Sequence, residues 1–165
     1  MKKDCCCWKE VKVLEIITAE EAGFCFGVKR AIDMAINAVK NNQDTPVYTL
    51  GSLIHNPQVV NKLKELGISS IDSVDEISEG ILIIRSHGIE PHSLEKAKNK
   101  GLHIVDATCP YVKKAQNFAR ELVESGYQTF IFGENDHPEV KGIYGYTKGK
   151  AYIVKNPEEI NEADL

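Results

Sequence analysis

Short apolar runs alternate along this chain with longer segments whose apolar residues recur every three or four positions. The short runs are typical of buried strands, and the longer periodic segments are typical of helices with one apolar face. Prolines mark the expected helix starts, where the missing N–H has no cost, and glycines follow expected helix ends, where a left-handed cap is favoured. Strands and helices in alternation predict a parallel sheet covered by helices, so the expected fold class is α/β.

The pattern gives the bounds of each expected element. Strands are expected at 11–17, 47–50, 81–85, 103–107, 128–132 and 151–154. Helices are expected at 27–40, 57–66, 91–100 and 110–125. Helix starts are expected at five prolines, which are Pro57, Pro91, Pro110, Pro138 and Pro157, and helix ends at Gly67, Gly101 and Gly126. The helix 110–125 is expected to bury one apolar face, formed by Val112, Ala115, Phe118, Ala119, Leu122 and Val123.

The same reading divides the chain into three parts. Residues 1–10, which include three adjacent cysteines at 5–7, are expected to be a disordered or non-native tail. Residues 11–110 are expected to form a first α/β lobe with a leading strand. Residues 111–165 are expected to form a second, truncated α/β lobe, because a new series of strands and helices starts near Tyr111.

Composition excludes several classes of protein. Apolar residues make up 42% and charged residues 27% of the chain, which is ordinary for a globular protein. The longest apolar run falls far short of the roughly 20 residues that a membrane-spanning helix needs. A formal charge of −4 argues against nucleic-acid binding as the main function. No signal-peptide pattern follows the basic start, so we expect a cytoplasmic chain with reduced thiols.

Side chains capable of chemistry gather between the strands and the helices that follow them. These side chains are Cys25, His55, His87, Cys109, His137 and Glu139. In a parallel sheet, such loops emerge at the carboxyl edge, where ligands bind in open α/β folds. The loops are therefore expected to converge on one site although they are distant in sequence.

The cysteines and histidines can each be interpreted as structural or as functional residues. An isolated cysteine is often a small core residue, but the positive end of a helix dipole stabilises a thiolate, which iron or zinc requires. A loop histidine is usually solvated or capping, but imidazoles beside free helix N–H groups suit a phosphate. The matched positions favour a metal at Cys25 and Cys109 and a polyanionic ligand at the three loop histidines. His92 and His103 fall outside the pattern and are interpreted as structural.

Five motifs carry a resemblance. The segments 22–31, 55–56, 86–88, 105–110 and 137–140 resemble, in order, the signature of the 4-hydroxy-3-methylbut-2-enyl diphosphate reductase (LytB/IspH) family. The resemblance implies a trefoil of three α/β lobes around an oxygen-sensitive 4Fe-4S cluster held by three cysteines. It also implies reductive removal of the substrate hydroxyl as water, which gives isopentenyl and dimethylallyl diphosphate with electrons from a ferredoxin- or flavodoxin-like donor.

The resemblance also implies roles for individual residues. Cys25 and Cys109 match the first two cluster ligands. His55, His87 and His137 match residues that hold the substrate diphosphate. Glu139 matches the acid of the proton relay, so Glu139 and His137 are the candidate catalytic residues.

The chain departs from the family pattern in its C-terminal part. No cysteine follows Cys109, so the third cluster cysteine and the third lobe are absent from these 165 residues. The chain is therefore interpreted as an N-terminal fragment that lacks turnover by itself. Two alternatives stay open, a diphosphate-binding α/β module without redox activity and a zinc hydrolase with Cys and His ligands.

Overall fold

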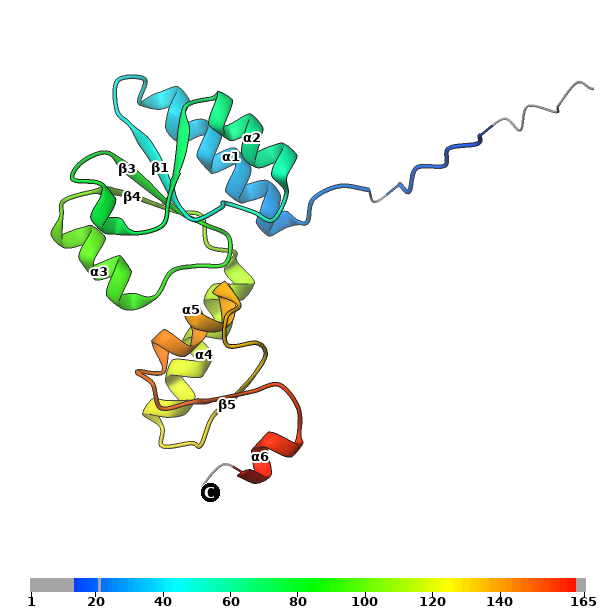
Figure 1. Ribbon diagram of the computed structural model, residues 1–165, viewed down its shortest axis with the longest axis vertical. Coiled ribbons are helices and arrows are strands. Elements are labelled where there is room, and N and C mark those ends of the chain that lie inside the picture. Colours follow the sequence, from blue (N-terminus) through cyan, green and yellow to red (C-terminus); the bar gives the residue numbers. More distant parts are fainter. Residues whose placement is uncertain (1–13, 21, 163–165) are drawn as a thin grey trace, which may run out of the picture.

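Two parallel sheets organise the chain in the computed structural model, which describes residues 14–20 and 22–162 (Figure 1). The larger sheet has the strand order β2-β1-β3-β4, and the smaller one pairs β5 with β6. All of these pairs are parallel, so the predicted α/β fold class is confirmed. The strands are β1 (Val47–Leu50), β2 (Ile68–Ile71), β3 (Ile81–Ile84), β4 (His103–Asp106), β5 (Phe130–Phe132) and β6 (Tyr152–Val154).

The helices follow the punctuation of the sequence closely. They are α1 (Phe26–Asn41), α2 (Pro57–Glu65), α3 (Pro91–Asn99), α4 (Pro110–Glu124), α5 (Pro138–Tyr146) and α6 (Glu158–Glu162). Proline occupies the first turn of α2, α3, α4 and α5, as expected. The glycines predicted to end α2, α3 and α4 have positive φ. The helix boundaries therefore come largely from local sequence.

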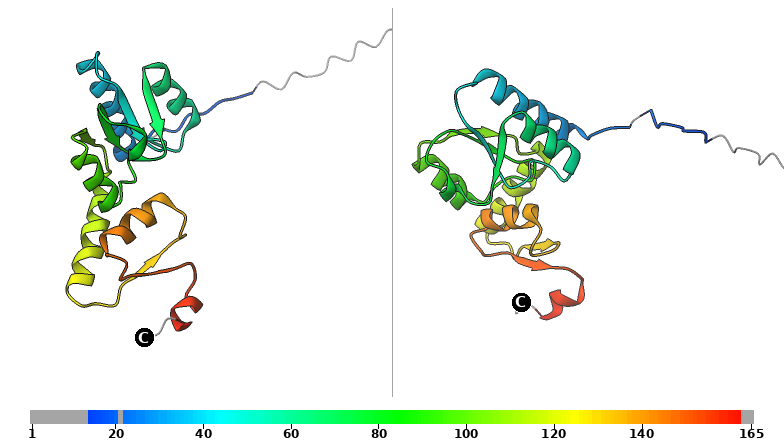
Figure 2. Two further views of the ribbon diagram at one scale, coloured as in Figure 1. Left: turned by 60° about the vertical axis from the view of Figure 1, so that its left-hand side comes forward. Right: turned by 45° about the horizontal axis from the view of Figure 1, so that its top comes forward.

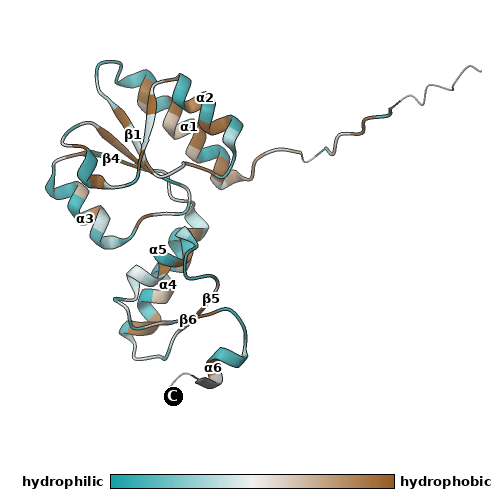
Figure 3. Ribbon diagram, in the orientation of Figure 1, coloured by the Kyte–Doolittle hydropathy of each residue, from teal (hydrophilic) through white to brown (hydrophobic). Residues whose placement is uncertain are grey.

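The larger sheet is covered on both faces. Successive residues of β3 point to opposite faces, so Ile81 and Ile83 pack against α1 and α2, whereas Leu82 packs with Ala97 of α3. Figure 3 shows these strands as largely apolar ribbons and the helices around them with alternating apolar and polar segments. The smaller sheet packs on α5 through Ile131 and neighbouring residues. The two sheets share no strand in the part of the chain that is described, and a lobe boundary at residue 110 stays a prediction.

The predicted leading strand at 11–17 is wrong for its described part. Residues 14–17 have no regular structure, and the side chains of Leu14, Ile16 and Ile17 are 82, 80 and 83% exposed. Residues 11–13 and the predicted tail at 1–10 lie outside the described residues. An apolar run forms a strand only where a neighbouring strand completes its hydrogen bonds, and no described strand pairs with this segment.

The burial prediction for α4 is also partly wrong. Phe118 and Leu122 are 53 and 43% exposed, whereas Gln116 is only 2% exposed. The buried face of α4 is turned toward α5 and toward the loop after β3, which leaves part of the apolar face in solvent. Two short elements were not predicted, β2 and the 3-10 helix η1 (Val74–Glu76). Their runs are too short to show a period.

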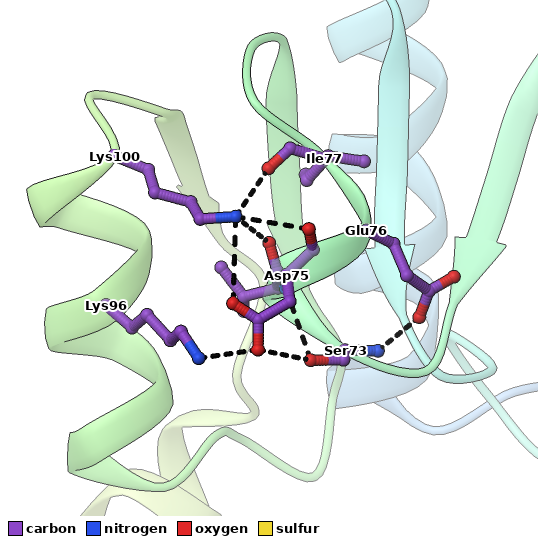
Figure 4. Close-up of polar contacts among 7 residues, drawn as sticks. Ser73, Asp75, Glu76, Ile77, Lys96 and Lys100 are labelled. Carbon is purple, nitrogen blue, oxygen red and sulfur yellow. Dashed lines mark hydrogen bonds and ion pairs between the residues drawn. The ribbon is translucent and has the colours of Figure 1, made fainter.

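A lysine joins α3 to η1. The Nζ atom of Lys100 donates to the carbonyl oxygens of Val74, Asp75 and Ile77 at 2.9, 3.3 and 2.8 Å (Figure 4). The neighbouring Lys96 reaches only the exposed Asp75 carboxylate, at 2.5 Å. Lys100 therefore donates the hydrogen bonds that these three carbonyl oxygens of and after η1 would otherwise accept from water.

We expect Lys100→Met to lower the free energy of unfolding by about 1–3 kcal/mol, because three carbonyls lose a charged donor. Lys96→Met is the matched control and should have a much smaller effect, since an exposed ion pair contributes little. Urea unfolding of the two variants measures the difference. Equal losses would show that the carbonyl contacts of Lys100 do not matter.

Candidate functional site

Three histidines from separate loops lie together at the carboxyl ends of the strands. His55 follows β1, His87 follows β3, and His137 is the residue before α5. The ring centroids of His55 and His87 are 4.5 Å apart, and His137 lies 6.4 Å from His55 and 6.0 Å from His87. A hollow of about 390 Å³ opens beside His55, where Ser52 and Asn56 line it. The fold thus gathers imidazoles that are distant in sequence, and of the three only His55 lines this hollow.

The protonation pattern of His137 follows from its hydrogen bond. The backbone N–H of Glu139 donates to Nδ1 of His137 at 3.3 Å, a contact that caps α5. A nitrogen that accepts a hydrogen bond carries no proton, so the proton of a neutral His137 is assigned to Nε2. His137 therefore offers an N–H donor to a ligand even when it is uncharged. Glu139 stands in the first turn of the same helix and is half-buried.

Burial and neighbouring positive groups dominate the electrostatics around His87. Burial, then His55, Arg85 and His137, lower the pKa of His87 to about 4. Burial also lowers the pKa of Arg85. Among the described residues, the Nδ1 atom of His87 and the Nε atom of Arg85 are buried without a hydrogen-bond partner. None of the ion pairs found in that part of the chain involves these groups, so the Nε–H of Arg85 is an unpaired donor, which suits an anion.

The lowered pKa of His87 makes folding stability depend on pH. Between pH 6.5 and about 4, His87 is protonated in the unfolded chain, where its pKa is near 6.5, but stays neutral in the folded chain. Stability should therefore fall as pH drops through this window, by about 1–2 kcal/mol after allowance for partial exposure. Urea unfolding at pH 4.5 and 7 tests this, with His87→Asn as the comparison. The prediction fails if the His87→Asn chain shows the same pH dependence as the parent.

The two isolated cysteines occupy equivalent positions on two helices. Cys25 is the N-cap of α1 and Cys109 is the N-cap of α4, and neither side chain caps its own helix. Both are free thiols, Cys25 exposed and Cys109 half-buried. A Cβ atom on Gly27, two residues after Cys25, would lie 2.6 Å from Sγ of Cys109. Only glycine at this position lets the start of α1 approach the Cys109 thiol so closely.

Arg30 of α1 forms hydrogen bonds with the loop that carries Cys109. Its guanidinium donates to the carbonyl oxygens of Thr108 and Asp106 at 3.1 and 3.4 Å. The Asp106 carboxylate accepts from the Thr108 backbone N–H at 3.0 Å and pairs with Lys113. Burial opposes ionisation of Asp106, but the contacts with Lys113 and Thr108 prevail and lower its pKa. This network holds Cys109 beside the start of α1.

The donor set fits an iron site only in part. Two thiols stand at adjoining helix starts, which suits thiolate ligation. Across residues 14–20 and 22–162, however, no group of three or more His, Cys, Asp or Glu side chains is arranged to hold a metal ion. The same finding gives no support to the zinc-hydrolase alternative. Any cluster here would need a further ligand.

Sequence reasoning missed two polar groups near the histidines. Arg85 immediately precedes Ser86, His87 and Gly88, and its charge next to that motif was the available signal. Gln116 interrupts the apolar face of α4, where a polar residue at a core spacing could have indicated a special role. Both carry buried atoms that have no hydrogen-bond partner in the described part of the chain.

Comparisons with known proteins identify the family. A family model described as LytB protein matches residues 16–164. The chain belongs to the LytB family. The 4-hydroxy-3-methylbut-2-enyl diphosphate reductase of Geobacter metallireducens is 50% identical over 146 residues, which cover 88% of this chain and 51% of that protein. The protein of the same name from Caldanaerobacter subterraneus subsp. tengcongensis is 49% identical over 149 residues, covering 88% and 52%.

Solved structures agree with this membership of the LytB family. A structure of (E)-4-hydroxy-3-methyl-but-2-enyl diphosphate reductase, described as the terminal enzyme of the non-mevalonate pathway, has a TM-score of 0.78 and 49% identity. It is matched over 90% of this chain and 53% of its own. The corresponding reductase from Plasmodium falciparum has a TM-score of 0.83 and 32% identity, over 88% and 46%. This LytB-family chain therefore spans about half the length of its curated relatives.

One further expectation concerns membranes. Among the described helices of this LytB-family chain, none combines the length and apolar character needed to cross a bilayer.

Proposed function

We propose that this chain forms the diphosphate-binding part of a 4-hydroxy-3-methylbut-2-enyl diphosphate reductase and supplies two of its cluster cysteines. The observation that carries the proposal is the three-histidine cluster, with ring centroids 4.5–6.4 Å apart. The Cys109 loop adjoins it, because the backbone N–H of Cys109 donates to the carbonyl oxygen of Ser86, the residue before His87, at 2.9 Å. The relatives of that name are about half identical to this chain over the segment that bears these residues.

The histidines are assigned to the diphosphate. Nε2 of His137 is a donor in the neutral ring, and His87 lies where Arg85 and two other imidazoles already favour a negative charge. His55 is exposed and closes the triangle. A diphosphate has enough oxygens to accept from all three rings at once. Burial is the main cause of the lowered pKa of His87, and binding the anion would offset the further lowering by the neighbouring positive groups.

Glu139 is assigned to proton delivery, together with His137. It lies two residues after His137 on α5, and its backbone already contacts that imidazole. The reaction breaks the bond between carbon and the substrate hydroxyl and consumes two electrons and two protons. One proton leaves with the hydroxyl as water, and the other is added to carbon, which gives isopentenyl or dimethylallyl diphosphate. In the proposed reaction, Glu139 passes a proton to the departing hydroxyl.

Cys25 and Cys109 are the residues that would hold a 4Fe-4S cluster, with a third ligand from outside the described residues. When bound, the cluster would supply an iron for the substrate hydroxyl and pass on electrons from a ferredoxin- or flavodoxin-like donor. Arg30 and Gly27 keep the two thiols at adjoining helix starts. Because thiolate ligation needs reduced cysteines, we assign the protein to the cytoplasm.

The alternative is a diphosphate-binding module without redox activity. It is favoured by the histidine cluster, because the three rings lie within 6.4 Å of one another and the cluster includes no cysteine. Calorimetry with pyrophosphate on the iron-free chain separates the two when it is set beside iron analysis, after anaerobic reconstitution, of a chimera that continues these residues with the C-terminal half of the Geobacter metallireducens relative. Binding together with iron uptake supports the reductase, whereas tight binding without iron uptake supports the module.

The test of activity uses a chain in which these residues are continued by the C-terminal half of the Geobacter metallireducens relative. After anaerobic reconstitution with iron and sulfide, it should convert 4-hydroxy-3-methylbut-2-enyl diphosphate with a reduced donor. The 165 residues by themselves should show no turnover. A colourless, iron-free and inactive chimera that is nevertheless folded would contradict the proposal.

A further inference from the structure

A glutamine of α4 lies between the loop after β3 and helix α5. Gln116 lies on the buried face of α4 and is 2% exposed. Its Nε2 atom is buried and has no hydrogen-bond partner among the described residues. A buried amide without a partner is costly, so what this side chain contributes here is its volume and not a hydrogen bond.

The amide of Gln116 fills a space that two glycines leave open. A Cβ atom on Gly88, in the loop after β3, would lie 2.4 Å from Nε2 of Gln116. One on Gly142 of α5 would lie 3.3 Å from the same atom. The side chain is therefore wedged between the loop that carries His87 and the helix that begins after His137.

Helix α5 runs close to the His87 loop along this contact. A Cβ atom on Gly142 would lie 3.5 Å from the carbonyl oxygen of His87. One on Gly145 would lie 3.0 Å from Cδ of Pro91, where α3 begins. Figure 2 shows α4 and α5 lying side by side below the larger sheet. Because His137 caps α5, its place relative to His87 depends on how closely α5 meets this loop.

We propose that Gln116 is a positioning residue, whose carboxamide between Gly88 and Gly142 sets the separation of His87 from His137. The size of the Gln116 side chain sets the angle between the His87 loop and α5. The diphosphate as ligand rests on the proposed function, but the geometric role does not. Gln116 itself touches no reacting atom.

The readout is the pKa of His87. It is measured from the NMR signals of its imidazole as the pH of the 165-residue chain is changed. The groups that set this titration are His55, Arg85 and His137 around the ring, and Glu90, which interacts with Arg85. In Gln116→Ala the loop loses its support and water reaches His87. Its pKa should then rise from about 4 toward 6.5. Pyrophosphate affinity should fall about tenfold, the loss of one hydrogen bond to a charged group.

Two further variants make the test specific. Gln116→Met keeps the length of the side chain without the amide and should retain the titration of His87 and most of the affinity. Asn117→Ala, on the exposed side of the same helix, should change neither, and unshifted His92 and His103 signals report an intact fold. The proposal is overturned if Gln116→Ala leaves the His87 titration unchanged, or if Gln116→Met is as impaired as Gln116→Ala. If the parent chain binds no pyrophosphate, the proposed ligand fails, but the titration still decides the role of Gln116.

Discussion

Replacing either Cys25 or Cys109 by serine is expected to abolish iron uptake and turnover of the chimeric reductase. Both thiols stand at the starts of adjoining helices, and a cluster with two of its iron ligands in this chain cannot keep its geometry when one is lost. The measurement is iron content and visible absorption after anaerobic reconstitution, followed by product analysis. We expect both variants to be iron-poor and inactive.

The matched control replaces Cys5, Cys6 and Cys7 together by serine. These residues precede the segment that matches the LytB family, which begins at residue 16. The triple variant should therefore keep its iron and its turnover. Full iron content in Cys109→Ser, or loss of iron in the triple variant, would contradict the assignment of ligands.

Glu139→Gln is expected to lower turnover by about 10²–10⁴, the usual contribution of a general acid. The amide keeps the size of the side chain and the backbone contact to His137, so pyrophosphate affinity should stay within about threefold. The control is Glu134→Gln, an exposed carboxylate in the loop before α5 that should be silent. Iron content and pyrophosphate binding measured with turnover show which step fails.

An unchanged turnover in Glu139→Gln would remove this residue from the proton relay. Equal losses of turnover and pyrophosphate affinity would instead place it in diphosphate binding. The separation of the two quantities is therefore what identifies the proton donor.

The helices were predictable because their boundaries depend on local chemistry. Pro57, Pro91 and Pro110 begin helices wherever their missing N–H is harmless, and glycines end them by adopting positive φ. The same locality explains why the positions of Cys25 and Cys109 at helix starts follow from the amino-acid pattern alone. Parallel order then brings the loops after β1 and β3 to one edge of the larger sheet, whereas His137 comes from the loop after β5 of the second sheet.

What could not be predicted depends on contacts across the fold. The apolar segment at 14–17 reads as a strand, but strand formation requires a partner, which the described residues do not provide. Phe118 was expected in the core and is exposed, whereas Gln116 takes the buried place because α4 turns that face toward Gly88 and Gly142. The pKa of His87 likewise depends on its burial in the fold, and then on Arg85 and two imidazoles from other loops.

The central claim is that loops distant in sequence form one polyanion site. The most direct measurement is an NMR titration of the 165-residue chain with pyrophosphate, following all five histidines. We predict that the signals of His55, His87 and His137 shift together with one dissociation constant, while His92 and His103 stay in place. Separate dissociation constants for the three, or equal shifts at all five histidines, would contradict the account.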